Sequence, residues 1–329
     1  MSEKKELYEQ TSQYLHWRFT NEELARIRET NNRVAVERAR ENLAKEAQLR
    51  AQAAAGGDAS SQTKHQFLSV DDELTLIDYY QQSITTYARL YNLPDQVKAT
   101  AITFFKRFYV HNTVMDYPPK NIMATCVYLA TKTENSFISI DDFVKPLAKS
   151  KITNEDVLRY EFVVSQSLQF EFAVHHPYRP AYGLYLDMQA YVQDLETLRR
   201  TFEAVKHYIQ RSLHTDLCFH YMPSQIALAA WRLAASDTQL DIDQYLTAKF
   251  DAKSLNTLYQ ITDTIQDIIR VYQPAQKDTV REIDRRLFFT RNPAKNPQSL
   301  LYQKLQREEM ESSNSPVKER PLDADDVFS

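Results

Sequence analysis

Glycine is scarce in this sequence, and its scarcity excludes several kinds of phosphate-binding site. Only 3 of the 329 residues are glycine, where average usage near 7% would give roughly 23. A Walker loop, a dinucleotide-binding G-x-G-x-x-G turn and a kinase phosphate lid all need several glycines for positive φ and close approach to phosphate. Gly183 stands alone, and Gly56 and Gly57 lie in a low-complexity stretch. None of these three loops is therefore expected.

Cysteine, net basic charge and long apolar runs are also lacking. The two cysteines, Cys126 and Cys218, lie far apart inside apolar segments, which predicts reduced packing residues and no zinc module. Lys and Arg total 40 against 44 Asp and Glu, so no basic field indicates a nucleic-acid partner. The charged N-terminus is followed by no run of 18 apolar residues. We expect a soluble, nuclear or cytoplasmic protein whose partners are proteins.

Apolar residues recur at helical spacing in almost every segment, so the fold class is predicted to be all-α. At roughly 150 residues per domain, the length allows about two domains. Thr20 and Glu23 form a capping box that begins the first long helix, with Phe19 placed to pack on Leu24. This charged helix passes into residues 51–66, rich in Ala, Gln, Gly and Ser, which predict a flexible linker.

After the linker, the pattern predicts five helices in succession. Pro118 and Pro119 open the third, residues 121–132, whose apolar side chains cover most of its circumference. A helix that is apolar on so many sides is expected at the centre of a bundle. Ser139 and Thr153 are predicted N-caps of the fourth and fifth helices.

An internal repeat organises the chain. The sequence YPPKNI at residues 117–122 recurs as YMPSQI at residues 221–226, and Leu129-Ala130 recurs as Leu233-Ala234 at the same offset. The domain is therefore predicted to be duplicated. The copies meet near residues 175–180, where prolines interrupt any continuous helix.

Four motifs carry a resemblance to a known family. They are HWRF with EELARIR (residues 16–28), FFKRFYVHNTVMDYPP (104–119), HHPYRP (175–180) and MPSQIALAA (222–230). Over about residues 12–290 the chain resembles the cyclins, and among them the cyclin H type. The resemblance implies tandem five-helix cyclin box repeats with extra N- and C-terminal helices.

The expected organisation has six parts. They are an N-terminal helical extension (1–50), the flexible linker (51–66), a first cyclin box (67–174), a second cyclin box (175–275), a C-terminal helical extension (276–310) and a disordered tail (311–329). The polar, acidic tail contains the sequence SPVK, a proline-directed phosphorylation pattern, which makes Ser315 a candidate modification site.

The resemblance also assigns roles to particular residues. In cyclins, a lysine at the end of the third helix and a glutamate in the fifth hydrogen-bond backbone groups near the C-helix of the kinase. Those positions are Lys132 (LATKTEN) and Glu161 (RYEFVV), and Phe170 and Phe172 match positions that make apolar contact with the kinase. The second repeat has Ser236 where the first has Lys132. This asymmetry favours the first repeat as the kinase-facing half.

Two departures separate the chain from cell-cycle cyclins. Thr133, Glu134 and Asn135 follow the lysine, where those cyclins have an aromatic residue and two acids. Residues 72–76, with the sequence DELTL, stand where those cyclins carry a Met-Arg-Ala-Ile-Leu patch that docks substrates. Both departures fit a transcription-type cyclin.

Other conspicuous residues have simpler interpretations. Four histidines are candidate metal ligands: His175, His176, His214 and His220. They lie on separate segments without i, i+4 ligand spacing, so no metal site is predicted. The aromatic run from Phe104 to Tyr109 is expected to be core, with Lys106 and Arg107 at a solvated edge. The N-terminal helix is either a solvated rod or a helix that docks on the second repeat and helps to contact the kinase.

The function that the resemblance implies is that of the regulatory cyclin subunit of the CDK-activating kinase in TFIIH, with no catalysis and no cofactor of its own. The expected partners are a cyclin-dependent kinase, a RING-containing assembly factor and the TFIIH core, in the nucleus, without direct nucleic-acid or membrane contact. A DNA-contacting factor of the TFIIB type is the alternative, although the zinc ribbon and basic face that it needs are missing. A helical hydrolase lacks a nucleophile or metal constellation.

Overall fold

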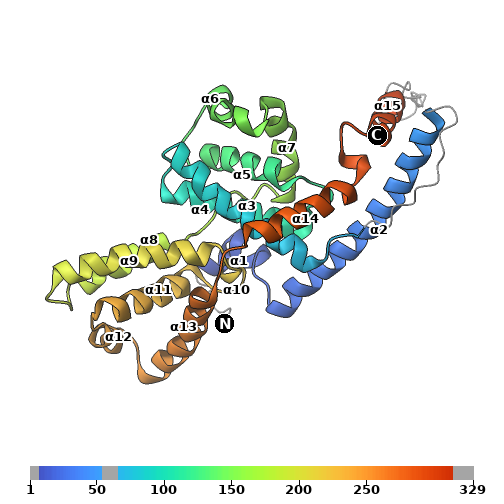
Figure 1. Ribbon diagram of the computed structural model, residues 1–329. Helices are drawn as coiled ribbons and strands as arrows, with labels where there is room; N and C mark the ends of the chain where they lie inside the picture. The colour runs from blue at the N-terminus through green and yellow to red at the C-terminus, as the bar shows by residue number, and fades with distance from the viewer. Residues whose placement is uncertain (1–6, 54–65, 314–329) are drawn as a thin grey trace, which may run out of the picture.

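The computed structural model describes residues 7–53 and 66–313, and within these ranges every regular element is a helix. Two helical bundles follow one another along the chain, and a long N-terminal helix runs beside the C-terminal helices (Figure 1). The predictions of an all-α fold and of tandem five-helix repeats with extra terminal helices are confirmed. Among the helices of these ranges, none combines the length and the apolar character that crossing a bilayer requires.

The N-terminal part contains three elements: η1 (Tyr8–Gln10), α1 (Ser12–His16) and α2 (Asn21–Ala53). The predicted capping box begins α2, since Thr20 N–H donates to the Glu23 carboxylate at 2.8 Å and Glu23 N–H donates to Thr20 Oγ1 at 3.2 Å. Phe19 and Leu24 lie in one small apolar cluster, which also contains Phe219 of the second repeat. The start of this helix was therefore predicted correctly.

α2 is longer than the composition indicated. It continues through Ala53, because Ala and Gln are good helix formers, so residues 51–53 are helical rather than part of a linker. The remainder of the expected linker, residues 54–65, lies outside the described ranges.

The first repeat has five α-helices and one short 3-10 helix: α3 (Val70–Leu90), α4 (Asp95–His111), α5 (Pro119–Thr133), α6 (Ile140–Val144), η2 (Lys145–Ser150) and α7 (Asn154–Ser167). The predicted N-caps are confirmed, because Ser139 and Thr153 each accept a hydrogen bond from the N–H three residues later. Pro119 is the first residue of α5, where its missing N–H leaves no intrahelical bond unmade. As predicted, α5 is central and packs against α3, α4 and α7.

The second repeat has the same order, with one short helix added: α8 (Tyr178–Met188), α9 (Leu195–Leu213), α10 (Leu217–His220), α11 (Pro223–Thr238), α12 (Asp243–Lys249) and α13 (Ala252–Val271). α11 is the counterpart of α5 and packs against α8, α9 and α13. Pro180 lies in the first turn of α8, so the proline-rich junction begins the next helix as well as ending the previous segment.

After the second repeat the chain returns to the first through α14 (Lys277–Thr290), η3 (Pro293–Lys295) and α15 (Leu300–Ser313). α14 packs on α3 and α2, and α15 packs on α2 (Figure 1). The buried Glu46 carboxylate of α2 accepts hydrogen bonds from the N–H groups of Leu300 and Leu301, at 3.2 and 2.8 Å, and so caps α15. α15 runs three residues into the expected tail. Residues 314–329, and with them Ser315, lie outside the described ranges.

α2 docks mainly on the first repeat, whereas we expected the second. Asn31 Nδ2 donates to the Val110 carbonyl of α4 at 2.8 Å. Only the first turns of α2 reach the second repeat, where Arg28 makes a bidentate pair with Asp216 at 2.7 and 3.0 Å. Ala35 of α2 is fully buried, which excludes the solvated-rod interpretation.

The aromatic run of α4 lies in the core, as predicted, but the solvated edge predicted for Lys106 and Arg107 is wrong. These residues are only 5% and 1% exposed. Lys106 Nζ donates to the carbonyl of Leu213, the last residue of α9, and to the carbonyl of Thr215, two residues later. The Arg107 guanidinium lies 4.8 Å from the centre of the Trp17 ring. α2, α3, α5 and α9 surround α4, so this helix has no solvent-facing side.

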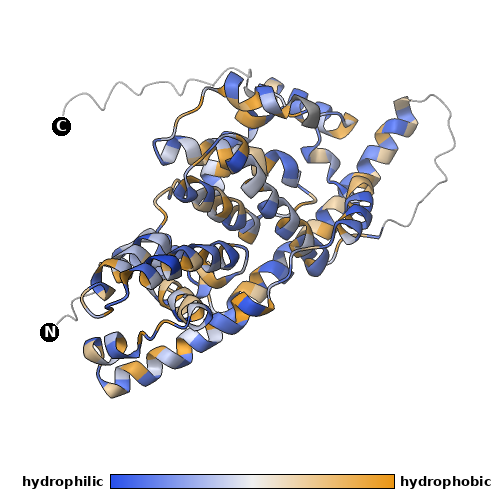
Figure 2. Ribbon diagram, turned by 60° about the vertical axis from the view of Figure 1, so that its left-hand side comes forward, coloured by the Kyte–Doolittle hydropathy of each residue, from blue (hydrophilic) through white to orange (hydrophobic). Residues whose placement is uncertain are grey.

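Hydrophilic and hydrophobic residues alternate along most helices (Figure 2), and the interior is mainly apolar. One large cluster fills the first repeat and includes Phe104, Phe105 and Phe108, all fully buried. Cys126 belongs to this cluster and Cys218 is half-buried at the junction; both are free thiols. The packing role predicted for the cysteines therefore holds for Cys126 in the core and for Cys218, which packs on the small cluster of Leu24, Val110 and Phe219.

Candidate functional site

Lys132 and Glu161 meet on the first repeat, although 29 residues separate them in the sequence. Lys132 lies in the last turn of α5, and its Nζ is 2.5 Å from Glu161 Oε1 on α7. The lysine also lies over the Tyr128 ring, 4.5 Å from its centre. The two side chains are 34% and 23% exposed. Packing of α5 against α7 thus holds an ion pair at the surface, where its remaining donors and acceptors are available to a partner.

Phe170 and Phe172 belong to a row of aromatic rings that we call the aromatic ladder, comprising the exposed Phe162 and Phe170 and the partly buried Phe172. Adjacent ring centres are 6.1 and 6.3 Å apart, and Phe172 reaches Phe104 in the core at 6.0 Å. Phe162 is 66% exposed and Phe170 is 56% exposed. Aromatic residues are enriched at protein–protein interfaces, so the ladder is a candidate binding surface.

Phe162 was missed by the sequence reasoning. It directly follows Glu161 in the sequence RYEFVV, which was used only to place the glutamate. Because consecutive helical residues point about 100° apart, one α7 segment presents both the carboxylate of the ion pair and the outer ring of the ladder.

The residues after Lys132 are used within the fold. Glu134 accepts hydrogen bonds from Thr100 Oγ1 at 2.6 Å and from Gln96 at 2.7 Å, both on α4. Asn135 has a φ of 54°, in the left-handed region that asparagine tolerates. These residues therefore make a tight turn after α5.

The DELTL segment is covered by another helix. Arg286 of α14 makes a bidentate pair with the Asp72 carboxylate, and Leu76 is fully buried. Burial by itself raises the pKa of Asp72, but the hydrogen bonds from Arg286 and Ser69 outweigh it and lower the pKa overall. This segment is thus partly covered by α14, with Glu73 and Leu76 buried.

The second repeat builds a different pair on the equivalent helices. Ser236, at the position that corresponds to Lys132, is exposed. Arg232, one turn earlier on α11, pairs with Asp263 of α13 at 2.6 Å and lies 4.5 Å from the centre of the Tyr259 ring. The helix pair is conserved between the repeats as a scaffold, but the position and type of the cation differ.

The four histidines do not converge on one point. His176 is buried and its Nε2 lies 2.7 Å from Thr100 Oγ1; burial lowers its pKa to about 3. Burial likewise lowers the pKa of His214 to about 4, and this ring stacks on Tyr272. Both rings are neutral at pH 7. Within the described residues, no three His, Cys, Asp or Glu side chains are grouped so that they could hold a metal ion.

Both repeats match known family domains. Residues 58–173 match the family described as Cyclin, N-terminal domain, and residues 176–273 match the Cyclin C-terminal domain. The chain belongs to the cyclin family. Cyclin mcs2 of Schizosaccharomyces pombe is 32% identical to it over 312 residues, which cover 94% of this chain and 92% of that protein. Cyclin-H of Xenopus laevis is 32% identical over 231 residues, covering 67% of this chain and 71% of that protein.

Solved structures agree with this family. A chain in the structure of the CAK complex from Chaetomium thermophilum bound to ATP-gamma-S is 27% identical, with a TM-score of 0.77, and the match covers 98% of both chains. A chain in the yeast TFIIK (Kin28/Ccl1/Tfb3) complex is 33% identical, with a TM-score of 0.60, covering 80% of this chain and 100% of that one. The resemblance to cyclins of the H type is confirmed, and the TFIIB-type alternative is not favoured.

Proposed function

We propose that this cyclin is the regulatory subunit that binds and activates the cyclin-dependent kinase of a CDK-activating complex within TFIIH. The observation that carries the proposal is the likeness, over 98% of the chain, to a chain of a CAK complex. The partly exposed pair of Lys132 and Glu161 and the aromatic ladder support it, because they supply charged and apolar groups on one repeat.

In this proposal the cyclin performs no catalysis and changes the conformation of its partner. Lys132 and Glu161 hydrogen-bond backbone groups near the kinase C-helix, while Phe170 and Phe172 contact it with apolar surface. Binding the inward position of that helix more tightly than the outward one lets the glutamate of the C-helix pair with the ATP-anchoring lysine of the kinase. Shifting the equilibrium from 1:99 to 99:1 needs about 5.5 kcal/mol of differential binding, which a standard protein interface supplies.

The proposed partners are the kinase, a RING-containing assembly factor and the TFIIH core, and the proposed location is the nucleus. The similarity to a chain of the yeast TFIIK complex, which contains Kin28, Ccl1 and Tfb3, supports an assembly of three subunits. A net charge of −4 and the acidic excess of the sequence favour protein partners over nucleic acid.

Reconstitution tests the proposal. The full chain is mixed with the purified catalytic subunit of a CDK-activating kinase, and phosphate transfer to a peptide from the RNA polymerase II C-terminal domain is measured. We expect a stable complex and strong activation, with little activity from either subunit alone. A chain that binds no kinase but retards duplex DNA in a gel would support the TFIIB-type alternative instead.

A further inference from the structure

The segment that carries the inner two rings of the aromatic ladder has an unusual backbone. Residues 169–175 lie within the connection from α7 to α8 and contain no glycine. Gln169 and Phe170 nevertheless have φ values of 55° and 58°, in the left-handed region. A non-glycine residue in this region costs on the order of 1 kcal/mol or more, so the surrounding structure must hold the segment in place.

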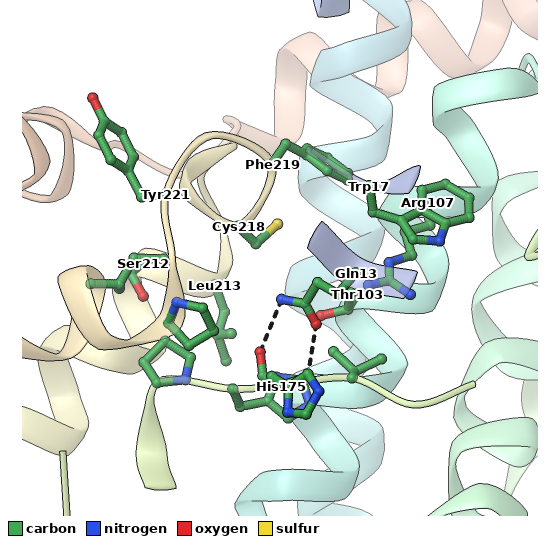
Figure 3. A pocket seen from close by; sticks show the side chains of 15 residues that line it. Gln13, Trp17, Thr103, Arg107, His175, Ser212, Leu213, Cys218, Phe219 and Tyr221 are labelled. Carbon is green, nitrogen blue, oxygen red and sulfur yellow. Dashed lines mark hydrogen bonds between the residues drawn. The ribbon is translucent and has the colours of Figure 1, made fainter. Parts of the chain in front are cut away.

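α1 holds one end of this segment. The buried Gln13 side chain makes two hydrogen bonds with the backbone of His175: Nε2 donates to the carbonyl at 3.1 Å, and Oε1 accepts from the N–H at 2.7 Å (Figure 3). A side-chain amide that satisfies both backbone groups of one residue fixes the position of that residue as a neighbouring strand would.

His16, the last residue of α1, and Trp17, which directly follows it, hold the segment a second time, at Glu171. Trp17 Nε1 donates to Glu171 Oε2 at 2.7 Å, and His16 Nδ1 lies 2.5 Å from Glu171 Oε1. Trp17 is itself fixed, since it is 1% exposed and packs against the guanidinium of the buried Arg107 (Figure 3). Arg107 Nη1 also donates to the Glu171 carbonyl at 3.4 Å.

We infer that α1 is a clamp that holds residues 169–175 in the conformation that presents Phe170 and Phe172, so that Gln13 and Glu171 are positioning residues for kinase binding. This inference rests on the proposed function. Neither residue needs to touch the kinase. Their contribution is that the ladder is already in its binding conformation, which avoids an ordering cost when the complex forms.

The first test uses the full chain without a kinase. Gln13→Ala removes both bonds to His175, and we expect the amides of residues 169–175 to exchange hydrogen at least ten-fold faster while the melting temperature changes little. Gln193→Ala is the matched control, because Gln193 is exposed and its side chain makes no hydrogen bond within the described residues. Unchanged exchange in residues 169–175 would overturn the clamp whatever the function of the protein.

The second test measures kinase binding by the full chain. We expect Gln13→Ala and Glu171→Ala to weaken binding five- to twenty-fold, and Glu171→Gln, which keeps an acceptor for Trp17, to weaken it less. Glu196→Ala, which breaks an exposed pair with Arg199, is the control for the loss of a carboxylate and should bind like wild type. Wild-type affinity in both alanine variants would refute the inference while leaving the proposed function intact.

A double-mutant cycle separates positioning from general destabilisation. If Gln13 acts through the ladder, Gln13→Ala should have almost no further effect on binding in a chain that already carries both Phe170→Ala and Phe172→Ala. Additive losses would show that α1 acts by another route and would overturn the assignment. If the wild-type chain binds no kinase, the proposed function fails, and the exchange experiment alone decides whether the clamp exists.

Discussion

The two repeats have the same helix order, but corresponding helices are buried to different extents. Every residue of α4 from Val97 to Val110 is buried, whereas its counterpart α9 buries only a stripe: Leu198, Thr201, Val205, Ile209, Ser212 and Leu213. α2 and α9 pack on sides of α4 that would face water in a lone repeat, while the outer side of α9 stays exposed. The position of a repeat in the molecule therefore decides which of its faces become core.

The surfaces of the two repeats also differ at the end of the central helix. The first repeat presents the pair of Lys132 and Glu161 next to the aromatic ladder, whereas the second has the exposed Ser236 at the lysine position and a cation one turn earlier. Duplication thus preserved the packing of the central helix and left its outer end free to diverge. Four measurements can break or sharpen this comparison.

The largest effect is expected from emptying the two cores. Phe108→Ala in the first repeat and Trp231→Ala in the second remove fully buried aromatic rings, and each should lower the free energy of unfolding by about 3–5 kcal/mol. Calorimetry should show one cooperative transition in both variants, because buried contacts such as those of Lys106 join the repeats. Phe288→Ala, at a ring that is 70% exposed, is the control. A second transition in one variant would mean that the repeats unfold separately.

The next effect concerns kinase binding. Lys132→Ala or Glu161→Ala leaves the other charge without its partner, and losing one member of a hydrogen-bonded pair at a desolvated interface costs about 2–5 kcal/mol. We expect affinity for the kinase to fall by tens-fold or more, mainly through faster dissociation, with little change in melting temperature. Surface plasmon resonance measures both.

The second repeat supplies the control for this site. Ser236→Ala should leave kinase binding almost unchanged, and the double variant of Lys132 and Glu161 should lose less than the sum of the single losses. Wild-type binding by both single variants would refute the assignment of these residues, whatever the partner proves to be.

The pH dependence of stability should differ between a buried carboxyl group of α3, the first helix of the first repeat, and an exposed one of α8, the first helix of the second repeat. Burial raises the pKa of Glu73 in α3 to about 7. Hydrogen bonds from Asn32 and from the Val114 N–H lower this pKa, and the negative charges of Asp116 and Asp72 raise it. Between about pH 4.5 and 7 the folded protein therefore holds a proton that the unfolded chain has lost. Stability contributed by this group falls as pH rises through that window, by up to about 3 kcal/mol.

Glu73→Gln stays neutral at every pH, so the loss of stability due to this group should disappear. The difference between the wild-type and variant melting temperatures, measured from pH 5 to pH 8, isolates this group from the buried histidines. Asp187→Asn is the control in α8, since Asp187 is exposed and remains ionised in both states over this range. Parallel curves for wild type and Glu73→Gln would contradict the assignment.

The smallest effect is expected at the joint between the repeats. Arg28→Ala removes the bidentate pair with Asp216, whose carboxylate keeps Lys106 as a neighbouring cation, 3.9 Å away. Because both partners are partly exposed, we expect a loss of about 1 kcal/mol in a urea titration. Arg281→Ala breaks the exposed pair with Asp278 and should change nothing measurable. Equal effects in the two variants would mean that the joint does not depend on this pair.

Local features of the fold were predictable, and features that depend on distant neighbours were not. The caps at Thr20, Ser139 and Thr153 were predicted because a cap needs only residues three positions apart. The burial of Lys106 and Arg107 was not, because the helices that cover them come from other parts of the chain. Hydrophobic periodicity describes one face of a helix and fails for a helix enclosed on all sides.

The sequence by itself determined that the chain is helical and duplicated and that it belongs with the cyclins, because helix caps, apolar spacing and repeated motifs are all local patterns. It also indicated Lys132 and Glu161, but only through the resemblance. The tertiary structure decided where α2 lies and which cations are buried. It also decided that Gln13 meets His175 and that Trp17 meets Glu171, each across more than 150 residues. Contacts of this kind depend on how the two repeats and the terminal helices pack, and no spacing along the chain encodes them.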